Sequence, residues 1–161
     1  MDIRLRPFED GDLPRFTAWL KEPHITPWYT PAEDWLHEVE NRHGEFSFIR
    51  HFIILADGAS IGFCQHYPYW RGGESWHGNL PLAGTYSIDY LIGELAYLRK
   101  GYGAEAIRLL VRDALAQPDA ARVIVQPDEL NAASRRAVLA AGFAFDAQNG
   151  LFILRREDLG A

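Results

Sequence analysis

The feature that most constrains the fold of this chain is a glycine-rich turn at residues 98–104, Leu-Arg-Lys-Gly-Tyr-Gly-Ala. An apolar, strand-like run at residues 86–92 precedes the turn, and an amphipathic run with helical spacing follows at residues 104–115. The first amides of a helix lack internal partners and carry partial positive charge, so they favour a bound phosphate. The sequence therefore predicts a strand–turn–helix unit with an anion site, to which Arg99 and Lys100 add charge.

The spacing of this turn disfavours the two commonest phosphate loops. A Walker loop ends in Gly-Lys-Ser/Thr, which the sequence lacks. A dinucleotide fingerprint needs a third glycine where Ala106 stands, and here an antiparallel-looking region precedes the unit. ATP hydrolysis and hydride transfer are therefore disfavoured, and an ordinary strand-to-helix turn remains the alternative to a phosphate site.

Length, charge and cysteine content narrow the class of protein. The 161 residues suit one domain, predicted at residues 1–161. The net charge of −6 argues against a nucleic-acid partner and is compatible with a cationic substrate. Cys64 is the only cysteine, so the sequence predicts no internal disulfide, no metal site and a small core residue at this position.

The sequence gives no targeting or membrane signal. Its start lacks the apolar core of a signal peptide, and no run reaches the ~18 apolar residues of a membrane span. A cytoplasmic protein without a membrane partner is expected, as a monomer or homodimer.

Hydrophobic periodicity and turn residues predict the order of elements. Strands are expected at residues 3–7, 46–56, 60–67, 86–92, 122–126, 143–145 and 151–154, and helices at residues 13–21, 32–41, 104–115 and 131–141. Asp10 or Asp12 is expected to cap the first helix, and Asp57-Gly58 to form a hairpin turn. This order predicts an α/β (α+β) fold with a mixed, mostly antiparallel twisted sheet of six to seven strands and helices on both faces.

Residues 86–115, Asn131 and the segment Ala141-Gly142-Phe143 form a pattern that resembles the GNAT superfamily of acyl-CoA-dependent N-acetyltransferases. The resemblance covers nearly the whole chain and implies the GNAT fold. The superfamily's acyl-CoA motif, Arg/Gln-x-x-Gly-x-Gly/Ala, begins here at Leu98, which replaces the usual Arg or Gln. Arg99, with the lysine that follows it, is expected to supply that charge instead.

Three segments resemble the aminoglycoside 6′-N-acetyltransferases within this superfamily: residues 19–28, residues 61–67 and Ile88-Asp89. The resemblance implies direct transfer of an acetyl group from acetyl-CoA, in a ternary complex, to a primary amine of a small cationic substrate. An aminoglycoside 6′-amine is the first candidate, which would make the activity one of antibiotic resistance. Acylation of a hydroxylysine for a siderophore or of a protein N-terminus is the alternative, and a CoA-binding module without catalysis is a third hypothesis.

The resemblance also implies which residues contact the pantetheine arm and the phosphates of acetyl-CoA: Ile92, Gly93, Leu95, Arg99, Lys100, Gly101, Tyr102, Gly103, Ala104, Asn131 and Arg136. Three of these have an alternative structural role. Gly93 suits a β-bulge, Asn131 suits a helix cap, and Arg136 suits a solvated helix face.

Asp89 is the predicted catalytic residue and the anchor for the amine. An ionised carboxylate on an otherwise apolar strand is costly, so it needs a partner or water. Strand alternation directs Asp89 to the face opposite Ile88 and Tyr90. A carboxylate beside a bound ammonium is expected to keep a low pKa. A salt-bridged structural aspartate is the alternative.

Loops rich in aromatic residues are expected to line the substrate slot, although packing of some of these rings in the core is an equal alternative. The predicted substrate-binding residues, besides Asp89, are Trp28, Tyr67, Glu74, Trp76 and Asp128.

The position at which many GNAT enzymes carry a tyrosine as general acid for the CoA thiolate is occupied by Val138. Either another group protonates the thiolate, with Tyr67, Tyr90 and Tyr97 as candidates, or the thiolate leaves unaided.

Overall fold

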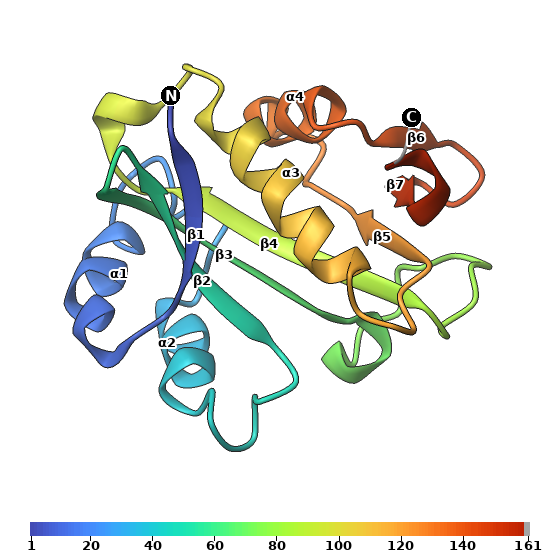
Figure 1. The fold of residues 1–161 in the computed structure, drawn as a ribbon, viewed down its shortest axis with the longest axis horizontal. Coiled ribbons are helices and arrows are strands. Elements are labelled where there is room, and N and C mark those ends of the chain that lie inside the picture. The colour runs from blue at the N-terminus through green and yellow to red at the C-terminus, as the bar shows by residue number, and fades with distance from the viewer. Residues whose placement is uncertain (160–161) are drawn as a thin grey trace.

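Seven strands form one continuous sheet in the computed structural model, which describes residues 1–159 (Figure 1). The spatial order is β1-β2-β3-β4-β5-β7-β6, and only the β4–β5 pair is parallel. The strands are β1 (Ile3–Pro7), β2 (Arg50–Ala56), β3 (Ala59–Pro68), β4 (Thr85–Ile92), β5 (Arg122–Val125), β6 (Ala144–Asp146) and β7 (Leu151–Arg155). The predicted mixed, mostly antiparallel sheet is confirmed; the last two residues of the predicted range 1–161 lie outside the described residues.

Helices cover both faces of the sheet, as predicted (Figure 1). The α-helices are α1 (Leu13–Trp19), α2 (Ala32–Glu40), α3 (Tyr102–Leu115) and α4 (Ala132–Ala140). Short 3-10 helices are η1 (Asp10–Asp12), η2 (Tyr69–Gly72), η3 (Leu95–Tyr97) and η4 (Arg156–Asp158). Along β2, Phe52 and Ile54 pack in the core beneath α3, whereas Ile53 packs in the core beneath α1 and α2. Burial on both faces explains why the central strands are apolar at successive positions.

The predicted strand at residues 46–56 begins later than expected, at Arg50. Before it, the N–H groups of Gly44, Ser47 and Ile49 each donate to the carbonyl three residues earlier. These local turns satisfy the backbone without a neighbouring strand, so residues 41–49 do not extend the sheet.

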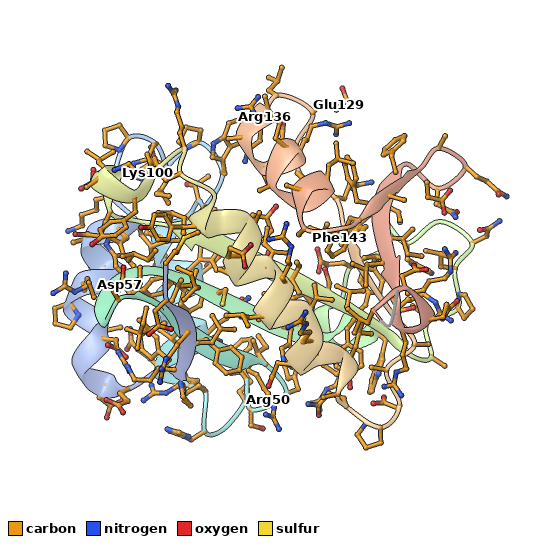
Figure 2. All side chains as sticks on the ribbon, turned by 45° about the horizontal axis from the view of Figure 1, so that its top comes forward. Arg50, Asp57, Lys100, Glu129, Arg136 and Phe143 are labelled. Atoms are coloured by element: carbon orange, nitrogen blue, oxygen red, sulfur yellow. The ribbon has the colours of Figure 1, made fainter. Side chains whose placement is uncertain are left out.

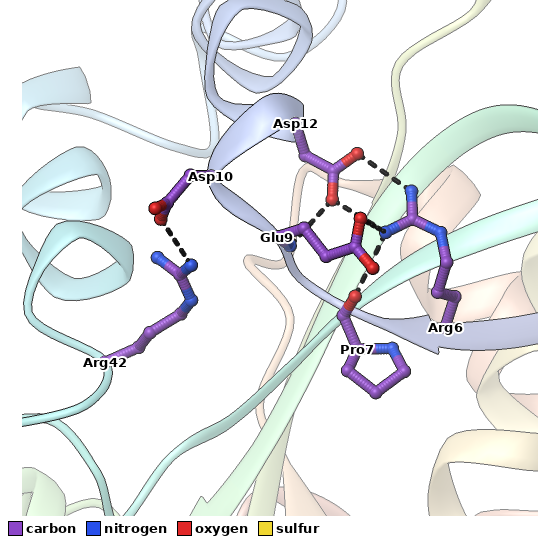
Figure 3. A network of polar contacts seen from close by, with 6 residues as sticks. All are labelled: Arg6, Pro7, Glu9, Asp10, Asp12 and Arg42. Carbon is purple, nitrogen blue, oxygen red and sulfur yellow. Dashed lines mark hydrogen bonds and ion pairs between the residues drawn. The ribbon is translucent and has the colours of Figure 1, made fainter.

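Asp12 occupies the N-cap position of α1, as predicted, but its side chain makes no capping hydrogen bond to the helix (Figure 3). Both oxygens of Asp12 accept from the guanidinium of Arg6, at 2.8 and 2.9 Å, and Asp10 accepts from Arg42 at 2.6 Å. The hydrogen bond to Arg6 lowers the pKa of Asp12. Because Arg6 and Arg42 bind the two carboxylates, the segment before α1 is held against β1 and against the turn after α2.

Trp19 fastens α1 to the end of β4. Its Nε1 donates to the Glu94 carboxylate at 2.7 Å, and a Cβ added to Gly93 would lie 2.1 Å from its ring. The N–H groups of Gly93 and Glu94 both donate to the carbonyl of Ile61, at 2.8 and 3.2 Å. Gly93 and Glu94 thus lie opposite the single residue Ile61, which is the arrangement of a β-bulge.

Replacing Gly93 by alanine is expected to destabilise the protein, because the buried Trp19 ring cannot move out of the way of a methyl group. The free energy of unfolding, measured by urea titration, should fall by about 1–3 kcal/mol. Gly11→Ala is the control, since nothing lies within 4 Å of its added Cβ, and it should change stability by less than about 0.5 kcal/mol. Equal stability of the two variants would contradict the close packing of Trp19 on Gly93.

Candidate active site

A fork in the sheet creates the candidate site. β4 and β5 pair only from Thr85 to Ser87, although β4 continues to Ile92. At the fork the hydroxyl of Ser87 donates to the carbonyl of Ile124 at 2.9 Å. Beyond it a cavity of about 230 Å³ opens, lined by β4, the segment after β5, the start of α4 and the loop between α1 and α2.

Two side chains contact the backbone of β4 beyond the fork. The hydroxyl of Tyr29 donates to the carbonyl of Tyr90, and Nε2 of His24 lies 2.9 Å from the carbonyl of Ile92. Since the N–H and C=O of one strand residue point to the same side, the amides of Tyr90 and Ile92 face the gap as well. The strand therefore offers hydrogen-bond donors along the cavity.

Asp89 lies on the face opposite Ile88 and Tyr90, as strand alternation predicted. It stands opposite Gln65 in the antiparallel register, and Nε2 of Gln65 donates to its Oδ2 at 2.9 Å. Within residues 1–159, no basic side chain forms an ion pair with Asp89. The alternative of a salt-bridged structural aspartate is therefore wrong.

The environment of Asp89 favours its protonated form. Burial is the largest cause that raises the pKa of Asp89; the Gln65 hydrogen bond lowers it and the nearby carboxylates of Glu74 and Glu38 raise it, so that together they bring this pKa to about 7. The sequence predicts a low pKa for Asp89 when an ammonium is bound beside it. In the ligand-free protein the pKa of Asp89 is raised instead. An arriving cation would lower this pKa, so Asp89 can bind a cation or accept a proton near neutral pH.

A second cavity, of about 290 Å³, adjoins the first on the α2 side of the sheet. Trp35, Tyr67, Glu74 and Asp89 line both cavities. Glu38 of α2 also lines the second one, and burial raises the pKa of its carboxyl. The two cavities thus form a slot with acidic and aromatic walls around Asp89.

The sequence prediction missed Glu38 and Gln65. Glu38 follows Trp35 by three residues on a helix, so helical spacing could have indicated a shared face. Gln65 becomes a neighbour of Asp89 only through the β3–β4 register, which no local signal specifies.

All five predicted substrate-binding residues besides Asp89 line the first cavity: Trp28, Tyr67, Glu74, Trp76 and Asp128. The Glu74 carboxylate accepts from the Tyr67 hydroxyl at 2.7 Å and from Nε1 of Trp76 at 2.8 Å. It therefore orients two aromatic side chains in the slot. Tyr69 instead lies fully buried in a core cluster, so part of the aromatic content packs the fold.

The start of α3 has the geometry that the glycine-rich turn predicts. Gly101 is the N-cap residue, with a left-handed φ of 85°, and no side chain caps the helix. The first amide with a partner inside the helix is that of Glu105, which donates to the Gly101 carbonyl at 3.2 Å. Nothing lies within 4 Å of an added Cβ at Gly101 or Gly103. The preceding helix amides are thus accessible to an anion.

The remaining predicted cofactor residues surround this helix start. Figure 2 shows Lys100 and Arg136 at the same edge of the molecule, and Arg99 is exposed beside Lys100 with a positive φ of 60°. Leu95, on η3, is 63% exposed. Of the predicted cofactor residues, Asn131 alone lines either of the two cavities.

Asn131 has the structural role that the sequence left open. Its Oδ1 accepts from the N–H of Ser134 at 3.2 Å, which caps α4, while the residue also lines the first cavity. Val138 is fully buried beneath α3, so the helix presents no hydroxyl at that position. Of the tyrosines considered, Tyr67 and Tyr90 line the cavity, whereas the Tyr97 ring packs against Tyr102.

Within the described part of the chain, no group of three or more His, Cys, Asp or Glu side chains is arranged to hold a metal ion. No helix among residues 1–159 is long and apolar enough to cross a membrane.

Asp89→Asn is expected to stabilise the protein at alkaline pH. Because the folded pKa of Asp89 is raised above its ordinary value, its contribution to stability is present at low pH and is lost as pH rises through about 7. The amide of Gln65 can flip to offer its unpaired Oε1 to the new amide. Urea titrations should show the variant more stable by on the order of 2 kcal/mol near pH 9 and equal to the wild type near pH 4. A difference that is constant with pH would contradict the raised pKa.

Comparison with known proteins identifies the family. The sequence matches the family described as Acetyltransferase (GNAT) domain over residues 9–150. No curated protein sequence matches the chain significantly. Among solved structures, the aminoglycoside acetyltransferase AAC(6')-Ib in complex with coenzyme A has a TM-score of 0.83 at 23% identity, covering 99% of this chain and 98% of its own.

Two further structures have similar folds. An aminoglycoside N(6')acetyltransferase from Legionella pneumophila has a TM-score of 0.74 at 18% identity and covers 99% of this chain and 96% of its own. A spermidine N-acetyltransferase from Vibrio cholerae has a TM-score of 0.73 at 15% identity and covers 99% of this chain and 98% of its own. At these identities the structures establish the fold, whereas the family match spans most of the sequence. The chain belongs to the GNAT family of acetyltransferases, which use acetyl-CoA as acetyl donor.

Proposed function

We propose that this protein transfers an acetyl group from acetyl-CoA to a primary amine of a small polycationic substrate, with an aminoglycoside 6′-amine as the first candidate. The observation that carries the proposal is Asp89, an acidic side chain without a basic partner between two acidic, aromatic cavities, next to the open edge of β4. Relatives of similar fold bind polyamines: an AAC(6')-Ib structure holds kanamycin with coenzyme A, and the spermidine N-acetyltransferase holds spermine with CoA.

The acetyl-CoA site in this proposal extends from the α3 start to the fork. The free amides of residues 102–104 bind the pyrophosphate, and Arg99, Lys100 and Arg136 offer positive charge around it. The pantetheine arm runs beside η3, Gly93 and the α4 cap and then follows the open edge of β4 past Ile92. The thioester then lies at the fork, beside Asp89.

The charges that change during acetyl transfer determine which groups the site must provide. An ammonium must lose a proton before it attacks, and the thioester oxygen becomes negative as the bond to nitrogen forms. Asp89 binds the ammonium and accepts its proton, directly or through water. The amides of Tyr90 and Ile92 are hydrogen-bond donors at the open edge of β4 and stabilise the negative oxygen.

The slot favours a substrate with several cationic groups. Glu38, Glu74 and Asp128 place negative charge on its walls in addition to Asp89. A sugar ring or an ammonium packs favourably on an aromatic face, which contributes about 0.5–2 kcal/mol per cation. Two adjoining cavities give room for more than one amine-bearing ring.

Arg71 supports a second candidate, the hydroxylysine substrate of a siderophore pathway. It lines the second cavity, and its guanidinium lies 4.5 Å from the centre of the Phe48 ring. A guanidinium at this end of the slot would pair with the carboxylate of an amino acid. An aminoglycoside has no carboxylate to match it.

A panel of amines with acetyl-CoA, monitored by thiol release, tests the proposal. Kanamycin-like compounds should release thiol, and Asp89→Asn should lower the rate at least about 100-fold while calorimetry still detects CoA binding. Asp119→Asn, an exposed carboxylate outside both cavities, is the matched control and should keep the wild-type rate. Turnover of hydroxylysine alone would support the second candidate, and CoA binding without turnover of any amine would indicate a binding module.

Gly101→Ala is expected to weaken CoA binding specifically. Gly58, at the β2–β3 hairpin, is the matched control, because both glycines have a φ of 85° and open space around an added Cβ. Both variants should lose about 1–2 kcal/mol of stability from the strained backbone. Only Gly101→Ala should weaken CoA binding, by about tenfold in calorimetry, since the displaced turn misaligns the phosphate-binding amides. Equal CoA affinity of the two variants would argue against a phosphate at this turn.

A further inference from the structure

The hydroxyl groups around the first cavity differ in whether their protons are already engaged. Tyr29 donates to the carbonyl of Tyr90, and Ser87 donates to the carbonyl of Ile124 at 2.9 Å. Tyr67 donates to the Glu74 carboxylate at 2.7 Å. None of these three hydroxyls can donate to a ligand without losing a partner.

Tyr90 and Ser134 are the exception. Their hydroxyl oxygens contact each other across the gap between β4 and α4, and either can be the donor. The Tyr90 hydroxyl also lies 3.4 Å from the Ser134 carbonyl, a longer hydrogen bond than those of the other three hydroxyls, so its proton is the one that a ligand can take over at least cost. When Ser134 donates to the Tyr90 oxygen, the Tyr90 proton can turn from the Ser134 carbonyl to a ligand in the cavity that both residues line, and the bond received from Ser134 strengthens it as a donor.

The two faces of β4 separate Tyr90 from Asp89. Asp89 points to the α2 side, into the acidic slot, and Tyr90 points to the side of α3 and α4. The proposed substrate amine comes from the first side, and the proposed CoA site, at the α3 start, lies on the second. The amine adds to the acetyl carbon from the Asp89 side, and the sulfur of the tetrahedral adduct, still joined to the CoA chain, lies on the Tyr90 side.

We propose that the Tyr90 hydroxyl, supported by Ser134, donates a hydrogen bond to the departing sulfur of acetyl-CoA and is a second catalytic residue. The inference rests on the proposed function. It also answers how the charge on sulfur is stabilised when Val138, buried in the core, offers no hydroxyl from α4. A donor already in place where charge develops is the most effective form of such stabilisation.

The step balances as follows. The C–N bond forms, the C–S bond breaks, and the electron pair of the C–S bond stays on sulfur. The ammonium first loses one proton to Asp89, which passes it to solvent. The nitrogen of the tetrahedral adduct loses a second proton, which reaches the thiolate through solvent because a thiol has a pKa of about 8.5. Burial raises the pKa of Tyr90 to about 12, which keeps the phenol protonated as a hydrogen-bond donor throughout.

The test measures the thiol of CoA bound to the protein. The ultraviolet absorbance of the thiolate, followed against pH in the CoA complex, gives the pKa of the bound thiol. In Tyr90→Phe this pKa should rise by about one to two units relative to the wild type, because the thiolate loses a charged hydrogen bond. CoA affinity should stay within about threefold of the wild-type value.

Tyr86→Phe is the matched control, because Tyr86 lies on the same strand face and donates to Asp119 at 2.8 Å, outside the cavity. It should leave the titration of the bound thiol unchanged. In Ser134→Ala the pKa of the bound thiol should be lower than in Tyr90→Phe, because the Tyr90 hydroxyl is still present. CoA calorimetry on each variant verifies that the site is folded.

Two results would overturn the inference while leaving the proposed function intact. One is an unchanged thiol titration in Tyr90→Phe with CoA bound. The other is a shift in Ser134→Ala equal to or larger than that in Tyr90→Phe, which would assign the donor to Ser134. Absence of CoA binding to the wild-type protein would refute the proposed function itself and the inference with it.

Discussion

The divergence of β4 and β5 beyond Ser87 is the constraint on which the site depends. An unpaired strand edge inside a protein is costly unless its backbone groups find partners. Tyr29 and His24 satisfy the carbonyls of Tyr90 and Ile92, while the amides of these residues remain directed to the gap. The same divergence opens the first cavity between the two strands. Ligand binding and fold are therefore linked at one point in the sheet.

The fork also explains the distribution of charge and hydroxyl groups. Adjacent residues of β4 project to opposite faces, so one acidic and one phenolic side chain flank the gap without contacting each other. On the α2 side the carboxylates of Glu38 and Glu74 surround Asp89 and disfavour its ionisation. A bound cation would relieve that repulsion, which is the physical basis of the preference for amines that we propose. On the α3 side the helix start provides the opposite sign of potential.

Sequence reasoning succeeded where the signal is local or periodic. The strand before the glycine turn, the helix after it and the Asp57-Gly58 hairpin follow from side-chain alternation and turn chemistry. It failed where a distant partner decided the outcome. Asp12 is a good helix cap by composition, but Arg6 takes its carboxylate. Ser134 was not singled out, because only packing of α4 against β4 brings it to Tyr90.

The sequence by itself determined the element order, the glycine-rich turn before α3, the family and the identity of the acidic residue on the apolar strand. These depend on patterns that span a few neighbouring residues, which the backbone converts directly into local structure. Only the tertiary structure decided that Gln65 faces Asp89 and that Glu38 from α2 and Glu74 from the loop before β4 lie near it. It also decided which partners the cavity hydroxyls have. Those facts depend on strand register and helix packing, which join residues far apart in the chain and have no local signature.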